Sequence, residues 1–192
     1  MLKTPNTVVD IHPLLSERWS PRSFDAQATM SDVDVLSLLE AARWAPSANN
    51  SQPWRIAVVR REDSEFQATV ETLAGFNKLW APRASAFFVV GIEHTDADNK
   101  ARKWAEYDTG IASALLTTQA HALGWHVHQM GGFNPEELHS RLGFNDRTKL
   151  ITVIAVGRLA RADQLTDELL QRETAERQRN ELKDIVVHGL PL

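Results

Sequence analysis

Apolar residues recur at two different spacings along this chain, and the two spacings predict alternating helices and strands. Spacing of three or four residues places apolar side chains on one face of a helix. We predict helices over residues 8–15, 31–46, 66–73, 98–123 and 135–142. Short apolar runs typical of strands lie between them, at residues 54–59, 86–92, 125–128 and 150–156. This order of elements predicts an α/β or α+β domain.

Particular residues mark where the predicted helices begin and end. Ser31, with Asp34 three residues later, is a helix-start signal. Pro46 stops the helix that follows, because proline removes a hydrogen-bond donor and clashes with the preceding turn. Gly124 is well placed to end the longest helix, which is predicted over residues 98–123.

The C-terminal end combines a charged segment with a short β-branched run. Residues 163–179 are rich in charge, whereas residues 185–187 read Ile-Val-Val. A strand of three residues is unstable alone. We therefore expect residues 185–187 to join the edge of an existing sheet, in their own subunit or in another.

Composition narrows the class of protein. The 192 residues are 43% hydrophobic and 24% charged, which is typical of a soluble globular chain. Because no repeat or linker divides the sequence, we expect one domain over residues 1–192. The absence of cysteine excludes disulfides, zinc fingers and thiol nucleophiles. A net charge of −4 makes nucleic-acid binding unexpected. Without a long apolar run or a signal-peptide pattern in Met1–Pro13, we expect no membrane contact and a cytoplasmic location.

Four polar segments are candidates for binding chemistry. Residues 18–24, Arg-Trp-Ser-Pro-Arg-Ser-Phe, place two guanidinium groups around a hydroxyl, a donor set that suits a phosphate. Residues 45–54 form a loop rich in amides and hydroxyls, which could hydrogen-bond the polar edge of a flat heterocycle. Gly131 and Gly132 would allow a ligand to approach the backbone closely. Arg172, Arg177 and Arg179 make up the fourth segment.

Each segment taken alone has a simpler explanation. Residues 18–24 are also compatible with a helix-ending turn with solvated arginines, and residues 45–54 with a stiff connecting loop. The paired glycines are also compatible with a tight turn, and the C-terminal arginines with a solvated helix face.

His126 and His128 alternate on a predicted strand without neighbouring carboxylates, so we expect no metal site. A Gly-x-Ser-x-Gly motif is absent, which argues against a serine hydrolase of that type.

Together and in this order, the four segments resemble the nitroreductase family of flavin-dependent oxidoreductases. Residues 18–24 resemble its Arg-x-Ser-x-Arg/Lys-x-Phe opening, and residues 46–54 resemble its Pro-Ser-x-x-Asn-x-Gln-Pro-Trp loop. The long helix ending at Gly124, the pair Gly131-Gly132 and the pair Arg177 and Arg179 follow in the family's order. The resemblance extends from about Leu14 to Val187 and implies an α+β fold with a central, mainly antiparallel sheet flanked by helices.

The resemblance also implies the cofactor and the residues that hold it. The family forms a homodimer with two FMN sites at the interface, and its C-terminal strand is exchanged onto the partner's sheet. The residues that this assigns to FMN are Arg18, Trp19, Ser20, Arg22, Pro46, Ser47, Ala48, Asn50, Gln52, Asn77, Met130, Gly131, Gly132, Arg177 and Arg179. Trp80 stands where some relatives have a lysine near the flavin, which implies a pocket edged by an aromatic ring.

Specific roles follow from the same resemblance. Arg18, Ser20 and Arg179 would hold the FMN phosphate with Arg177 beside them, and Arg22 would lie near the N1 and O2 edge of the ring. Asn50 and Gln52 would bond the ring or the ribityl chain, Pro46, Ser47 and Ala48 would come from the other subunit, and the Gly131 and Gly132 N–H groups would lie near N5 and O4.

The implied activity is hydride transfer from NAD(P)H to nitroaromatic, quinone or similar flat acceptors in a ping-pong sequence. No catalytic side chain is expected, since the chemistry belongs to the cofactor. The alternatives are a specialised flavin enzyme of the family, such as a dehalogenase, a dehydrogenase or a flavin-cleaving enzyme, and a non-catalytic module that binds or senses FMN.

Overall fold

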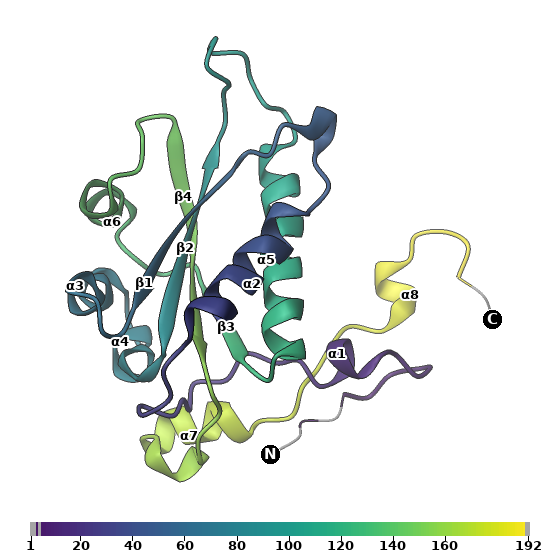
Figure 1. Cartoon of the computed structure of the whole chain (residues 1–192). Helices are drawn as coiled ribbons and strands as arrows, with labels where there is room; N and C mark the ends of the chain where they lie inside the picture. The colour runs from purple at the N-terminus through teal and green to yellow at the C-terminus, as the bar shows by residue number, and fades with distance from the viewer. Residues whose placement is uncertain (1–2, 4, 191–192) are drawn as a thin grey trace.

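A four-stranded antiparallel sheet forms the centre of the protein (Figure 1). The computed structural model describes residue 3 and residues 5–190, so Met1, Leu2, Thr4, Pro191 and Leu192 of the expected domain lie outside it. The strand order is β1-β2-β4-β3. The strands are β1 (Trp54–Arg60), β2 (Ala86–Glu93), β3 (His126–Met130) and β4 (Thr148–Gly157).

Helices cover both faces of this sheet. Helices α2 (Asp32–Arg43) and α5 (Ala105–Ala122) pack on one face, and α3 (Glu65–Thr72), α4 (Asn77–Trp80) and α6 (Pro135–Leu142) pack on the other (Figure 1). Strand β2 is buried along its whole length and divides its side chains between two cores, because successive strand residues point to opposite faces. The α+β class implied by the resemblance is confirmed.

The remaining helical elements are short. They are α1 (Pro13–Ser16), α7 (Asp167–Thr174), α8 (Leu182–Ile185) and three 3₁₀ turns, η1 (Ala48–Asn50), η2 (Ala81–Arg83) and η3 (Ala162–Gln164). No helix among the described residues is both long and apolar enough to cross a membrane.

Phe24 fixes the polar segment 18–23 to the end of the central sheet. Its side chain is fully buried and packs on the backbone of Gly157, where a Cβ would lie 2.6 Å from the Phe24 ring. An isolated bridge between Phe24 and Leu159 adds main-chain pairing just beyond β4. The phenylalanine at the end of the motif therefore anchors the preceding polar turn at this edge of the core.

The prediction of an opening helix over residues 8–15 is wrong for most of its length. Helicity is limited to α1, which begins at Pro13, where the missing N–H costs nothing. The His12 ring nitrogen Nδ1 accepts a hydrogen bond from the Leu14 N–H and caps this turn. Val8 and Val9 are 80% and 70% exposed, so no buried face within this chain stabilises an earlier start.

Two predicted helix ends also differ from the structure. The helix that follows Ser31 ends at Arg43 with Trp44 as its C-cap, two residues short of Pro46. The longest helix begins at Ala105 rather than near residue 98, because the Asp96 carboxylate accepts N–H bonds from Asp98 and Lys100 and closes a local turn. Its end is as predicted, with Gly124 in the left-handed region at φ +75°.

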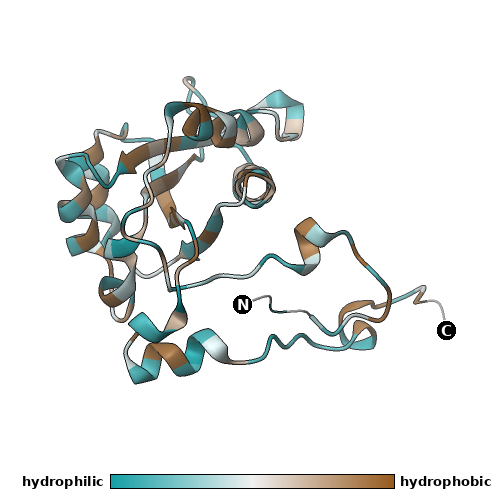
Figure 2. Cartoon of the chain, turned by 60° about the horizontal axis from the view of Figure 1, so that its bottom comes forward, coloured by the Kyte–Doolittle hydropathy of each residue, from teal (hydrophilic) through white to brown (hydrophobic). Residues whose placement is uncertain are grey.

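The C-terminal run does not form a strand within this chain. Residues 182–185 form the single turn of α8, and Val187 is fully exposed. Of the two sheet edges considered for Ile185–Val187, the edge in its own subunit is therefore excluded, and exchange onto a partner stays a prediction. The chain before α1 and the chain around α8 project from the body of the molecule on the same side (Figure 2).

Candidate functional site

The turn at residues 18–23 is held in place by strand β3 and by the segment after β4. The His128 ring nitrogen Nδ1 lies 2.9 Å from the Pro21 carbonyl oxygen, and the Ser23 hydroxyl donates to the Arg161 carbonyl at 2.7 Å. Burial lowers the pKa of His128 to about 4, so the ring is neutral near pH 7 and can donate one N–H to Pro21. These contacts leave Ser20 exposed at the tip of the turn.

A buried carboxylate supports the same turn from α7. The Glu173 carboxylate is 3% exposed and accepts the backbone N–H of Arg22 at 2.9 Å and that of Ser23 at 3.0 Å. Its Oε2 atom also lies 3.9 Å from Arg22 Nη1. Sequence reasoning missed Glu173, because nothing in the sequence separates it from the other acidic residues of the charged segment.

Three arginines from the first and fourth polar segments lie close together. The pKa of Arg18 is lowered mainly by burial and to a smaller extent by the positive charge of Arg179. The pKa of Arg177 is likewise lowered mainly by burial, with smaller contributions from the charges of Arg18 and Arg179. Arg177 Nη1 donates to the carbonyls of Lys3, at 2.9 Å, and of Ser16. No carboxylate of the described chain lies within 4.0 Å of these three guanidinium groups.

Such a cluster suits a multiply charged anion. Like charges held together without an acidic partner are unfavourable, and a phosphate offers each guanidinium paired acceptors. Arg18 and Arg179 are not engaged with any other side chain in the described structure, whereas Arg177 is taken up by main-chain carbonyls. This donor set fits the phosphate of the expected cofactor.

The end of β3 brings the paired glycines beside α4. Asn77 Nδ2 lies 3.5 Å from the Gly132 carbonyl oxygen, and the Ala74 N–H donates to the same oxygen at 2.9 Å. Gly131 has open space where a Cβ would be, so its backbone is accessible. The structure thus brings together Asn77, Gly131 and Gly132, three residues that the resemblance assigns to FMN.

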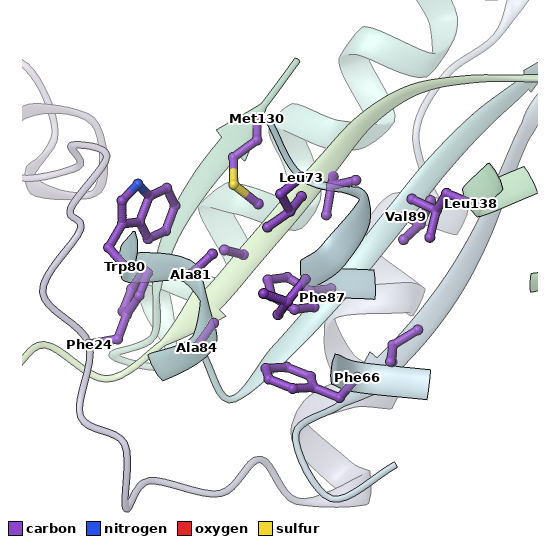
Figure 3. Close-up of a cluster of buried hydrophobic side chains, with 14 of the residues drawn as sticks. Phe24, Phe66, Leu73, Trp80, Ala81, Ala84, Phe87, Val89, Met130 and Leu138 are labelled. Carbon is purple, nitrogen blue, oxygen red and sulfur yellow. The ribbon is translucent and has the colours of Figure 1, made fainter. Parts of the chain in front are cut away.

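Two side chains expected near the ligand lie in the core instead. Met130 is 2% exposed, and its side chain points into the cluster that contains Leu73 and Phe87 (Figure 3). Trp80 is 1% exposed and lies 4.5 Å from the His128 ring and 5.9 Å from Phe24. The expectation that Trp80 edges a pocket is therefore wrong, because a large apolar ring is more stable in this core.

The side chain of Trp19 lines a hollow next to the turn. A pocket of about 290 Å³ is bounded by Trp19, residues 159–163, Glu173 and Thr174. Lys3 Nζ lies 4.5 Å from the centre of the Trp19 ring.

Within the described ranges, no group of three histidine, aspartate or glutamate side chains is arranged to bind a metal ion.

The amide-rich loop lies at the N-terminal end of α5. The Ala48 N–H donates to the Asp108 carboxylate at 3.1 Å, and the Gln52 N–H donates to Ser47 Oγ at 3.0 Å. Asn49, Asn50 and Gln52 have positive φ angles of 53°, 53° and 43°. Asparagine tolerates this left-handed conformation better than most residues. The exposed amides of Asn50 and Gln52 therefore stand on a loop of defined shape.

A second buried carboxylate, also missed from the sequence, holds this loop. Glu93 is 1% exposed and bonds Arg55 at 2.6 Å and Arg102 at 3.0 Å, with Asn145 donating at 2.8 Å. Arg55 Nη1 in turn donates to the Gln52 carbonyl at 3.1 Å. Glu93 thus orients Arg55 toward the loop.

One chain does not bring all the predicted site residues together. The loop at residues 46–52 lies at the end of α5 where the helix begins, whereas segments 18–22 and 177–179 lie toward its other end (Figure 1). An 18-residue helix is about 27 Å long at 1.5 Å per residue. The predicted residues of these segments therefore form two groups, which we call half-sites, toward opposite ends of this helix.

Comparison with known proteins identifies the family. The sequence profile of the nitroreductase family matches residues 15–158. The chain belongs to the nitroreductase family. This match includes segments 18–22, 46–52 and 131–132, and it ends before Arg177 and Arg179.

Individual nitroreductase relatives are similar over most of the chain. A crystal structure described as an oxidoreductase containing FMN superposes with a TM-score of 0.90 at 33% identity, covering 97% of this chain and 95% of that one. Bacillus subtilis YdgI, named for a proposed NAD(P)H nitroreductase activity, is 24% identical over 79% of this chain and 89% of its own length. A Thermus thermophilus NADH dehydrogenase is 30% identical over 62% of this chain and 73% of its own.

Proposed function

We propose that this nitroreductase-family chain is a homodimeric, FMN-dependent oxidoreductase that passes hydride from NAD(P)H to nitroaromatics, quinones or similar flat acceptors. The observation that carries this proposal is the cluster of Arg18, Arg177 and Arg179, which has no acidic partner within 4.0 Å in the described chain. The 33% identical oxidoreductase containing FMN and the names of the curated relatives support the cofactor and the activity.

The chain's own residues bind and orient the cofactor in this proposal. Arg18, Ser20 and Arg179 hold the phosphate, and Arg177 adds charge behind them. Arg22 lies at the N1 and O2 edge, where its positive charge favours the reduced ring. The N–H groups of Gly131 and Gly132 face N5 and O4. When bound, FMN supplies the hydride chemistry, accepting from NAD(P)H and donating to the acceptor in turn.

The second half-site comes from a partner subunit in this proposal. Because residues 46–52 lie at the far end of α5, the loop of one chain completes the site of the other. Large apolar side chains that are 37–101% exposed support such an interface: Val8, Val9, Ile11, Leu15, Val33, Leu36, Tyr107, Leu115, Leu182, Ile185 and Val187. So many exposed apolar groups are typical of a contact surface. Each chain then contributes residues 1–192 as one domain.

The test is an anaerobic titration of the purified protein. We expect it to bind FMN, to lose the oxidised-flavin absorbance when NADH or NADPH is added, and to regain it when a nitroaromatic or a quinone follows. A chain that binds no FMN in excess cofactor would contradict the proposal. Bound FMN that NAD(P)H does not reduce would instead indicate a binding or sensing module.

A further inference from the structure

Glu173 carries a charge that its structural contacts do not require. The backbone N–H groups of Arg22 and Ser23 need an acceptor oxygen, which a neutral amide would also supply. Burying an ionised carboxylate is costly unless a cation lies nearby. The cation closest to this carboxylate among the described ion pairs is Arg22, whose Nη1 atom is 3.9 Å from Glu173 Oε2, and the charge of Glu173 also raises the pKa of Lys3 against the effect of burial.

The same pair lies in a half-buried environment. Glu173 is 3% exposed and the Arg22 side chain 24% exposed, so water screens their interaction only in part. No other carboxylate in the described chain lies within 4.0 Å of the Arg22 guanidinium. Burial lowers the pKa of Arg22, and the charge of Glu173 opposes this effect. Arg22 thus has one nearby counter-charge, held on α7.

We propose that Glu173 is a positioning residue that draws the Arg22 guanidinium toward α7, offsets its charge and thereby lowers the reduction potential of bound FMN. This inference rests on the proposed function, which places Arg22 at the N1 and O2 edge. Negative charge appears at that edge on reduction, so a group that attracts Arg22 away from it weakens binding of the reduced form more than of the oxidised form.

Glu173→Gln is the direct test, because glutamine removes the charge and keeps one oxygen in the place of Oε1, which accepts from both backbone N–H groups, at 3.1 Å from Arg22 and 3.0 Å from Ser23. We expect the ratio of reduced-form to oxidised-form FMN affinity to rise about tenfold, which moves the midpoint potential about 30 mV more positive for a two-electron couple. The measurement is an anaerobic redox titration at saturating FMN. Asp167→Asn, on the exposed first turn of the same helix, is the matched control and should leave the potential unchanged.

A double-mutant cycle tests whether the effect passes through Arg22. In an Arg22→Met background, Glu173→Gln should no longer change the potential. Glu173→Asp keeps the buried charge but withdraws it from the guanidinium, so a smaller positive shift is expected even if Glu173→Gln does not fold.

The outcomes separate this inference from the proposed function. An unchanged or more negative potential in Glu173→Gln or Glu173→Asp would overturn the role of Glu173. So would a shift of equal size in the Arg22→Met background, because the charge would then act directly on the ring. Failure of the wild-type protein to bind FMN would overturn the proposed function and this inference with it. An Arg22→Ala potential equal to that of wild type would overturn the placement of Arg22 at the ring, and with it this inference, but not the proposed function.

Discussion

Arg179 and Arg22 carry the same charge, but their positions predict different effects on the cofactor. Arg179 clusters with Arg18 and Arg177, which suits a phosphate, whereas Arg22 is paired with Glu173 beside β3. Phosphate does not change charge when the ring is reduced, so its contacts should not distinguish the two redox states. The two arginines therefore separate affinity from reactivity.

Arg179→Ala should weaken FMN binding by about tenfold to a hundredfold, the loss expected for one charge-assisted contact of about 1.5–3 kcal/mol. Its midpoint potential at saturating FMN should equal that of wild type, whereas Arg22→Ala should lower it. Fluorescence titration gives the affinity and a redox titration the potential. Arg161→Ala is the control, since this side chain is 88% exposed and paired with Asp163. An Arg179→Ala protein of wild-type affinity would place the phosphate elsewhere.

Buried histidines should make the protein sensitive to acid. Burial lowers the pKa of His128 from 6.5 to about 4, so protons bind the unfolded chain first as the pH falls. The contribution of this group to the free energy of unfolding is therefore fully present above pH 6.5. It falls progressively as the pH is lowered toward 4, by about 3 kcal/mol for this one group.

His128→Asn keeps an amide donor near Pro21 and removes the titrating ring, so its free energy of unfolding should fall less between pH 7 and pH 4 than that of wild type. Urea unfolding at several pH values measures this difference. The exposed His188→Asn should behave like wild type. Equal pH dependence in His128→Asn and wild type would show that the ring is not buried neutral.

Among the elements, those that pack within the chain could be predicted from the sequence. Strand β2 and helix α6 lie where the apolar pattern places them, because each buries side chains against its own sheet. Residues 8–12 and 185–187 could not be predicted correctly, since their apolar side chains have no buried face in this chain. The polar segments 18–22 and 46–52 were recognisable from residue type. Glu93 and Glu173 were not, because the groups that they bond lie far away in the sequence.

The C-terminal segment gives a prediction at the level of one element. Deleting residues 184–192 removes Ile185 and Val187, which have no core contact in their own subunit, and should weaken the dimer and its FMN binding. Sedimentation velocity with detection at the flavin wavelength measures both. A shorter deletion of residues 189–192 keeps the apolar run and should behave like wild type. A fully dimeric, FMN-loaded protein lacking residues 184–192 would show that this segment does not hold the partner.

In the molecule as a whole, the two half-sites are separated by the length of α5. Residues 46–52 and 177–179 lie toward opposite ends of α5, so a single chain leaves each half incomplete. In the proposed dimer, the exposed apolar residues of the terminal segments and of α5 would contact the second copy. The proposed flavin site therefore requires dimerisation.

Native mass spectrometry of the purified protein after incubation with FMN tests this requirement most directly. We expect two chains carrying two FMN molecules, with FMN lost when the complex dissociates into single chains. A single chain that retains FMN, or a dimer that remains free of FMN in excess cofactor, would contradict it.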